Sequence, residues 1–206
     1  MKKRILSVIV LLLVLTGTFV MSTLCVSAET VKHTVVKGES MWKIAVKYQA
    51  GLSEIIAAND QIKNPALIYP GQILNIPIVP KETTSFEQQV IDLTNKERAK
   101  AGLPALKANW ELSRVARLKS QDMHDKKYFS HQSPTYGSPF DMIKSFGIKY
   151  NTAGENIAKG QATPQAVVNA WMNSAGHREN ILKASFKEIG VGYVASGHYW
   201  TQMFIG

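Results

Sequence analysis

Histidine and glutamate side chains stand in three short polar clusters in the second half of the chain. The clusters are Tyr128-Phe129-Ser130-His131, Gly154-Glu155-Asn156-Ile157-Ala158, and the segment 171–180, which contains His177. Imidazole and carboxylate groups transfer protons near neutral pH and also bind zinc. Two histidines and one glutamate from separate loop-like stretches would suit such chemistry if the fold brings them into one cleft. Otherwise they are solvated loop residues.

Several helices and a final hairpin must position these clusters. The capping pattern Ser85-x-x-Gln88 predicts a helix to about Lys100. Further helices are expected after Asn109, Ser138-Pro139 and Thr163-Pro164, the last ending near Gly176. The final segments, 189–194 and 199–204, change to a strand-like pattern around a turn. This order predicts an α+β domain.

The segment before residue 80 has the pattern of a second, smaller unit. A β-type run at 33–36 precedes a helix from Met41 to Tyr48, a second helix runs through Ala58, and 73–76 is a second strand. The spacing i, i+3, i+4 puts Trp42 on the core side of the first helix. The expected order is therefore β-α-α-β.

Two motif blocks of this smaller unit, HTVVKGESMWKIA at 33–45 and IYPGQILNIP at 68–77, resemble a LysM domain over its whole length. The resemblance implies a module that binds N-acetylglucosamine chains, as in peptidoglycan or chitin, in a groove between two loops. Exposed loop backbone can hydrogen-bond the acetamido groups of such chains. The expected carbohydrate-binding residues are Gly38, Glu39, Ser40, Met41, Asn64, Pro65, Ala66, Leu67, Ile68 and Tyr69.

The three polar clusters, with the final motifs Ile189-Gly190-Val191-Gly192 and YWTQMF at 199–204, resemble the CAP superfamily of cysteine-rich secretory, antigen 5 and pathogenesis-related proteins. The resemblance covers about 86–206 and implies an α-β-α sandwich with a large cleft holding two histidines and two acidic residues. Carried over, the histidines are His131 and His177, and the first acidic residue is Glu155. The second acidic position is Ser174, which supplies neither an anionic ligand nor a base. Glu179 is a weak substitute because it lies beyond the break at Gly176.

The chemistry of this set stays open between two roles for Glu155. With His131 and His177 it would complete the two nitrogens and one carboxylate of a catalytic zinc site. Alternatively, it hydrogen-bonds a histidine and fixes its tautomer. If Glu155 binds metal, no second acid or base remains for catalysis. No cofactor is required, and zinc is the metal that His131 and His177 would bind.

The first 28 residues have the layout of a secretory signal peptide, with three basic residues, an apolar run and a small-x-small site at Val26-Ser27-Ala28. Cleavage after Ala28 would leave 178 residues, remove the only cysteine, Cys25, and lower the net charge from +9 to +6. A chain without cysteine has no thiol for nucleophilic catalysis. The alternative is an uncleaved anchor, since the apolar run is nearly long enough to span a bilayer.

The chain is thus expected to comprise a signal peptide (1–28), a LysM module (29–80), a polar linker (81–84) and a CAP domain (85–206). Neither folded unit has a dense run of lysine and arginine, so no nucleic-acid partner is expected. The mild basic excess suits diffuse attraction to an anionic cell wall. After signal cleavage no stable membrane span is expected.

These features predict a secreted bacterial protein of the cell wall. Its LysM unit would bind peptidoglycan, and its CAP unit would be a non-enzymatic module that binds a wall enzyme or envelope protein during wall remodelling or sporulation. The alternative is a metal-assisted hydrolase of wall peptide, glycan or protein that uses His131, Glu155 and His177. Fold resemblance does not decide between them, because one fold supports different chemistries.

Overall fold

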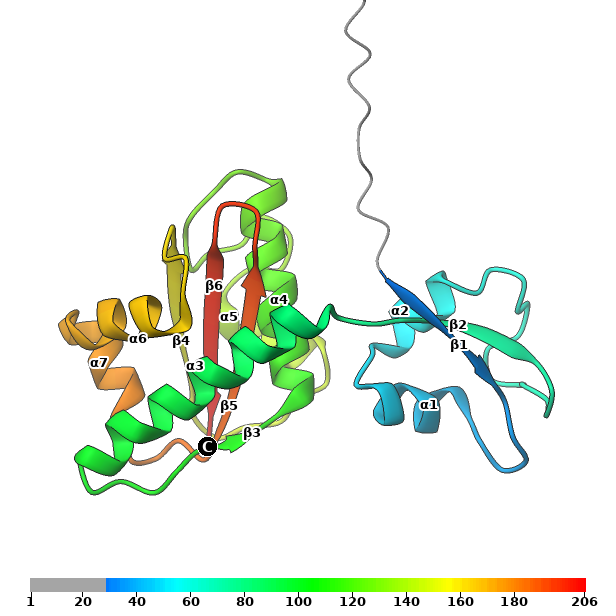
Figure 1. The fold of residues 1–206 in the computed structure, drawn as a ribbon, viewed down its shortest axis with the longest axis horizontal. Helices are drawn as coiled ribbons and strands as arrows, with labels where there is room; N and C mark the ends of the chain where they lie inside the picture. Colours follow the sequence, from blue (N-terminus) through cyan, green and yellow to red (C-terminus); the bar gives the residue numbers. More distant parts are fainter. Residues whose placement is uncertain (1–28) are drawn as a thin grey trace, which may run out of the picture.

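The computed structural model describes residues 29–206, which form two folded units (Figure 1). The predicted signal peptide lies outside the described residues. Between residues 29 and 206, the chain has no helix with the length and apolar character needed to cross a membrane.

The first unit is the predicted β-α-α-β module. Strand β1 (Thr30–Thr34) pairs antiparallel with β2 (Ile73–Pro77). Helices α1 (Met41–Tyr48) and α2 (Leu52–Ala57) lie between them in the chain. Ser40 caps α1 by accepting a hydrogen bond from the Lys43 amide. The buried core consists of Val35, Met41, Ile44, Ala45, Ala50, Ile55, Leu74 and Ile76.

The second unit is an α-β-α sandwich, as the CAP resemblance implied. Its sheet has the strand order β3 (Lys107–Ala108), β5 (Glu188–Val194), β6 (Tyr199–Ile205), β4 (Ala153–Lys159). The pair β3–β5 is parallel and the other pairs are antiparallel.

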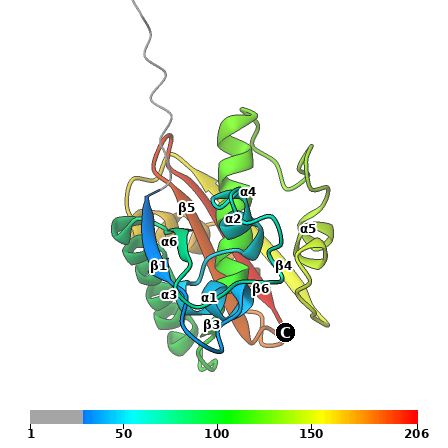
Figure 2. The same cartoon turned by 90° about the vertical axis from the view of Figure 1, so that its right-hand side faces the viewer.

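Helices cover both faces of this sheet (Figure 2). Helices α3 (Lys81–Lys100) and α6 (Pro164–Met172) lie on one face, and α4 (Trp110–Asp125) and α5 (Pro139–Ser145) lie on the other. The short helix α7 (Ala175–Ile181) follows α6 and contacts both β4 and α3. The helices and the final hairpin therefore confirm the predicted α+β class.

Two glycines of β5 explain the close packing of α4 on the sheet. A Cβ atom at Gly192 would lie 2.0 Å from the backbone nitrogen of Arg117, and one at Gly190 would lie 2.3 Å from the carbonyl carbon of Leu112. Ile189 and Val191 alternate with these glycines, so their side chains project from the opposite face and join the main core. The Ile-Gly-Val-Gly motif thus presents a smooth face to a helix and an apolar face to the core.

The connection between the units corrects one prediction. Helix α3 begins at Lys81, so the predicted linker 81–84 is helical and Ser85 lies inside the helix instead of capping it. The Thr84 amide already donates to the Pro80 carbonyl. Since residues 81–84 include neither glycine nor a further proline, nothing in them delays the start of the helix.

A bidentate ion pair joins the two units. Arg114 of α4 donates to both carboxylate oxygens of Glu54 of α2, at 2.9 and 2.7 Å, and to Ser53 Oγ at 3.1 Å. Bidentate arginine–carboxylate pairs fix geometry as well as adding energy. The first unit therefore docks beside α4, on the far side of the second unit from strand β4 (Figure 1).

Candidate functional site

The first predicted glycan-binding loop is a tight turn held by Glu39. Its carboxylate accepts hydrogen bonds from the Val36 amide at 2.9 Å and from the buried His33 ring at 2.7 Å. The bond from the Val36 amide, followed by that from His33, lowers the pKa of Glu39. Gly38 takes the left-handed backbone conformation, with φ of +87°, that the turn requires.

The second predicted loop, 64–69, presents apolar side chains to solvent. Leu67 is 51% exposed and Tyr69 is 56% exposed. The Tyr69 amide donates to Gln72 Oε1 at 2.6 Å, which holds the end of the loop. Ile68 packs against the same apolar cluster that buries Met41, so the two loops converge on one core.

Most of the predicted carbohydrate-binding residues are accessible, but two side chains of the unit point differently from expectation. Met41 is buried in the core, which leaves only its backbone available to a ligand. Trp42 was predicted in the core and is instead 51% exposed, so that prediction is wrong. The buried stripe of α1 runs through Met41, Ile44 and Ala45. One residue of rotation, about 100°, takes Trp42 off that stripe.

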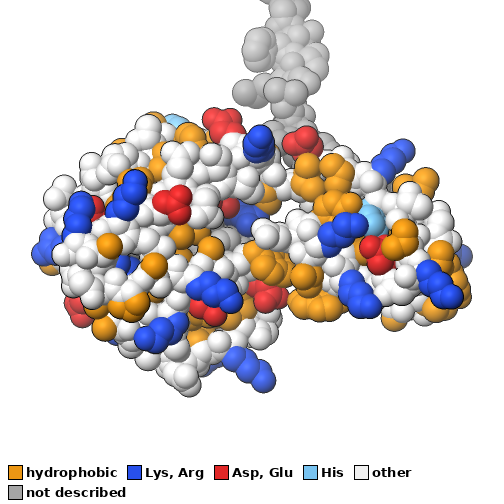
Figure 3. Space-filling view, turned by 60° about the horizontal axis from the view of Figure 1, so that its bottom comes forward, with side chains coloured by type: hydrophobic (Ala, Val, Ile, Leu, Met, Phe, Trp, Pro, Cys, Tyr) orange, Lys and Arg blue, Asp and Glu red, His pale blue; other side chains and the backbone are white. Residues whose placement is uncertain are grey.

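Hydrophobic side chains gather on the surface of this first unit (Figure 3). Among the described residues, seven large exposed hydrophobic side chains belong to it and two to the second unit. The seven are Val36, Trp42, Val46, Ile56, Leu67, Tyr69 and Ile73. Exposed apolar patches of this kind mark binding surfaces.

In the second unit, the fold brings His131 and Glu155 into direct contact. Glu155 lies on β4, and His131 lies in the loop that follows α4. Their Oε1 and Nδ1 atoms are 2.6 Å apart, with the Glu155 side chain buried and the His131 side chain 53% exposed. Burial raises the pKa of Glu155, although the His131 bond and the nearby Lys119 charge oppose the rise. Of the two predicted roles, the geometry favours the one in which Glu155 orients a histidine.

His177 is tied to the same strand through backbone and amide contacts. The Asn156 side chain donates to the His177 carbonyl at 3.1 Å, and the Asn180 side chain donates to the Glu155 carbonyl at 3.2 Å. Burial, together with the charge of His131, lowers the pKa of His177. His177 is therefore held near the His131–Glu155 pair as a predominantly neutral imidazole at physiological pH.

Two of the three polar clusters lie in a strand or a helix, whereas the sequence analysis expected all three to lie in loop-like stretches. The Gly154–Ala158 cluster lies within β4, and residues 175–181 form α7 with His177 and Glu179 on it. Ser174 caps α7 without a side-chain hydrogen bond, and Glu179 is exposed. Neither residue is linked by an ion pair or hydrogen bond to the described part of the cleft.

The donor set does not fit a catalytic zinc with three protein ligands. Over residues 29–206, no group of three or more histidine, cysteine, aspartate or glutamate side chains is placed to hold a metal ion. His131 Nδ1 is also engaged by Glu155. Zinc binding by His131 and His177 alone remains a prediction, and no chemical step is derived through it.

Buried charges on α4 hold the His131 loop, and the sequence analysis missed them. Lys119 is fully buried and donates to the His131 carbonyl at 2.6 Å. Asp122 accepts hydrogen bonds from Tyr128 at 2.6 Å, from Ser133 at 2.7 Å and from Thr135. Burial alone would raise the pKa of Asp122, but these bonds lower it. A signal was present, because Lys119 continues the buried stripe of Leu112, Val115 and Ala116.

Family models match both units. Residues 91–204 match the model of the cysteine-rich secretory protein family (CAP), and residues 33–77 match the LysM domain. With its α-β-α sandwich and its His131–Glu155 pair, this chain belongs to the cysteine-rich secretory protein (CAP) family and carries a LysM domain before the CAP domain. The sequence has no cysteine in either domain.

Particular relatives cover parts of the chain. Over 127 residues it is 65% identical to the uncharacterized protein YkwD of Bacillus subtilis, which covers 62% of this chain and 49% of YkwD. A 45-residue stretch, 22% of this chain, is 47% identical to 12% of SpoIVD-associated factor A of the same species.

A solved structure supports the CAP assignment. The 1.5 Å crystal structure of an extracellular protein containing a SCP domain from Bacillus anthracis is 37% identical, with a TM-score of 0.58 over 66% of this chain and 47% of that one. The present chain therefore spans about half of YkwD and about half of the crystallised protein.

Proposed function

We propose that this chain is an extracellular protein of the bacterial cell wall. Its LysM domain binds peptidoglycan through N-acetylglucosamine, and its CAP domain is a non-enzymatic binding or regulatory module. The pairing of the two domains and the SCP-domain relative support an extracellular, wall-associated role. A 45-residue stretch is also 42% identical to 7% of the spore coat assembly protein ExsA of Bacillus cereus, which adds support for a role in sporulation.

The observation that carries the non-enzymatic proposal is the composition of the CAP cleft. Its carboxylate, Glu155, is already bonded to His131, and a serine stands at the second acidic position. General acid–base hydrolysis uses one group to activate water and another to protonate the leaving group. Among the described residues, no second carboxylate is hydrogen-bonded to this pair, which favours a site that holds a partner over one that cleaves it.

A hydrolase remains the second candidate because one geometric feature favours it. Glu155 fixes His131 through Nδ1, and the His131 side chain is half exposed. A carboxylate-oriented imidazole with a free Nε2 is the arrangement of a general base. In this candidate His131 takes a proton from water while the water oxygen bonds to an electrophilic carbon of the wall polymer. The imidazolium then returns that proton to the amine or alcohol that leaves as the old bond breaks.

Substitutions of exposed side chains test whether the LysM domain binds peptidoglycan. Because these side chains lie outside the core, the module should stay folded. The double variant Leu67→Ala/Tyr69→Ala removes the apolar groups of the 64–69 loop. We expect affinity for purified sacculi to fall about tenfold, since a lost aromatic or aliphatic anchor costs about 1–2 kcal/mol. Co-sedimentation at several protein concentrations measures the change.

The matched control is Val46→Ala/Ile56→Ala, which removes two other exposed apolar side chains from the helices of the same unit. It should leave sacculus affinity within about twofold, below the roughly 1.4 kcal/mol of a tenfold change. Equal losses in both double variants would show that binding is non-specific adhesion of apolar surface.

A further inference from the structure

A basic hollow lies on the surface of the CAP unit, at the point where three separate parts of the chain meet. It has a volume of about 370 Å³. Its lining comes from the end of α4 and the following turn, the last residue of β4, and the β5–β6 turn with the start of β6. The residues are His124, Lys127, Lys159, Ser196, Gly197 and Tyr199.

The buried ring of Tyr199 organises this hollow. Lys159 Nζ lies 4.6 Å from the centre of the ring, and the His124 ring meets it edge-on with the centres 5.9 Å apart. A Cβ atom at Gly197 would lie 2.9 Å from the Tyr199 ring, so the backbone of the turn rests directly on it. The His124 ring is also 2.9 Å from Ser196 Oγ, which links α4 to the hairpin turn. The contact with the Tyr199 ring therefore holds the Lys159 side chain against the wall of the hollow.

The hollow carries positive charge without an equal negative charge. In the described part of the chain, neither Lys127 nor Lys159 has a carboxylate oxygen within 4.0 Å. The nearest acidic group on the same element, Asp125, is paired with the His124 ring at 2.7 Å and also accepts from Gln121. Two lysine charges therefore remain available to an anion.

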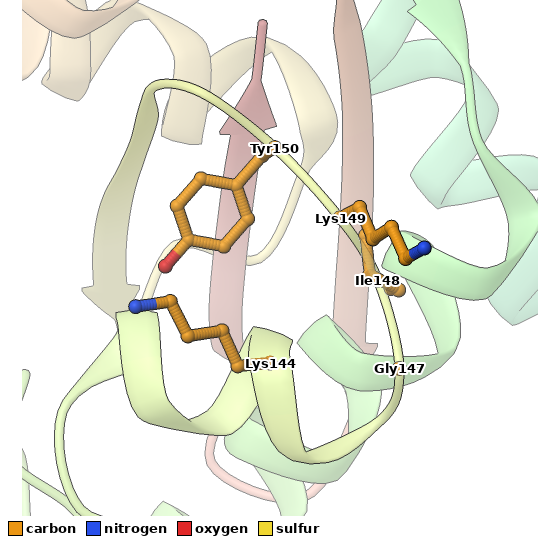
Figure 4. A pocket seen from close by; sticks show the side chains of 5 residues that line it. All are labelled: Lys144, Gly147, Ile148, Lys149 and Tyr150. Atoms are coloured by element: carbon orange, nitrogen blue, oxygen red, sulfur yellow. The ribbon is translucent and has the colours of Figure 1, made fainter.

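A second hollow in the same unit offers a comparison, because it also contains two lysines and a tyrosine. It is lined by Lys144, Gly147, Ile148, Lys149 and Tyr150, a single stretch of chain, and has a volume of about 360 Å³. The Lys144 amino group lies near Tyr150, whereas Lys149 points away from both (Figure 4). This second hollow therefore has two lysine charges, as the first one does, but its two amino groups point in different directions.

We propose that the hollow of Lys127 and Lys159 binds a phosphate group. Lysine binds phosphate as a compact point charge, and the Ser196 hydroxyl adds a hydrogen-bonding group at the wall of the hollow. Lys159 and Glu155 lie four residues apart on β4, so they face the same side of the strand at a separation of roughly 13 Å. A phosphate held here lies on the same side of β4 as the His131–Glu155 pair but about four residues further along the strand, so only an extended phosphate-bearing ligand could reach both.

The test is a titration of residues 29–206, which contain both folded units, monitored by amide NMR signals at constant ionic strength. The probes are inorganic phosphate and poly(glycerol phosphate), neither of which contains N-acetylglucosamine. We expect saturable shifts at Lys159, Gly197 and Tyr199. We expect affinity to fall about tenfold in Lys127→Glu/Lys159→Glu and to change less than about twofold in Lys144→Glu/Lys149→Glu, because only the first pair lines the proposed phosphate site.

The outcomes distinguish a polymeric ligand from free phosphate, and they distinguish a specific site from diffuse electrostatic attraction. Tighter binding of the polymer identifies a phosphodiester chain as the ligand, and tighter binding of inorganic phosphate identifies a free phosphate. Shifts that do not saturate, or equal losses in the two double variants, overturn the proposal. All four lysines are exposed, so both double variants should retain the wild-type fold. The result is independent of sacculus binding by the LysM domain.

Discussion

The LysM surface takes its residues from two loops of one small unit, whereas the CAP cleft takes His131, Glu155 and His177 from three elements that only the tertiary fold brings together. The LysM loops present backbone groups and exposed apolar side chains. The cleft instead depends on buried charges, including Lys119 under the His131 loop and Glu155 on β4. The geometry of the second site should therefore be the more sensitive of the two to substitution of buried residues.

The largest expected difference between the two regions is the loss of stability when a glycine is replaced by alanine. Gly192→Ala places a Cβ atom 2.0 Å from the backbone of α4, which cannot move without shifting the helix that carries Lys119. We expect the free energy of unfolding of the CAP unit to fall by about 3 kcal/mol or more. Urea unfolding followed by NMR signals of each unit measures this loss.

Gly71→Ala in the LysM unit is the matched change. This glycine has a φ of +89° but no atom within 4 Å of an added Cβ, so only backbone strain of about 1–2 kcal/mol is expected. A larger loss at Gly71 than at Gly192 would contradict the view that the CAP unit is the more tightly constrained region.

The pH dependence of stability should have opposite signs in the two units. Glu87 lies on α3, with its buried carboxyl facing β5. Burial raises the pKa of this carboxyl from 4.5 to about 7, although Arg117 and the Tyr193 amide oppose the rise. A carboxyl with a raised pKa in the folded state binds its proton more tightly there than in the unfolded chain. The stability of the CAP unit should therefore fall between about pH 4.5 and pH 7, by on the order of 2 kcal/mol.

The lowered pKa of Glu39 predicts the reverse for the LysM unit, with stability present above pH 4.5 and lost below it. Unfolding free energies measured from about pH 3 to about pH 7.5 would check both signs, since the Glu39 effect lies below pH 4.5 and the Glu87 effect lies above it. The variant Glu87→Gln should reduce the slope of the CAP unit, with the remainder expected from Glu155, and should leave the slope of the LysM unit unchanged. A CAP stability that rises between about pH 4.5 and pH 7 would show that Glu87 ionises normally beside Arg117.

A smaller effect is expected where the two regions meet. Arg114→Ala removes the bidentate pair with Glu54, whose carboxylate side chain is 36% exposed. The loss of stability should be below about 1 kcal/mol, as for other partly exposed pairs. The relative orientation of the units should nevertheless become more variable, which residual dipolar couplings detect. Lys107→Ala, an exposed substitution on β3, is the control. Unchanged couplings in Arg114→Ala would show that other contacts fix the units.

Much of the fold was predictable because its signals are local. Helix caps, turn residues and the Ile-Gly-Val-Gly motif indicated most helices and the final hairpin. The strand β4 was missed because Gly154, Glu155 and Asn156 read as a polar loop. The side chains of Glu155 and Asn156 form hydrogen bonds with partners far away in the sequence, such as His131, Gln202 and Asn180. Lys119 was missed for the same reason, since its partners lie outside its own helix.

The predicted site residues also divide into those with a local sequence signal and those that depend on contacts between distant parts of the chain. The LysM loops follow from contiguous motifs, but the exposed Trp42 and the buried Met41 point differently from expectation. For the CAP cleft, the residue types suggested two roles for Glu155, and the 2.6 Å contact with His131 favours the orienting one. Periodicity alone cannot give such a contact because residues 131 and 155 are joined through the sheet and not along the chain.

The central claim, that the CAP cleft binds without cleaving, is tested most directly by incubating the protein with purified sacculi. Mass spectrometry of the supernatant measures released wall fragments, and co-sedimentation measures binding in the same samples. The account predicts that wild-type protein and Glu155→Gln both bind the sacculi and release nothing above a protein-free control. Release of fragments by the wild type that disappears in Glu155→Gln, with sacculus binding unchanged, would contradict it and establish a hydrolase.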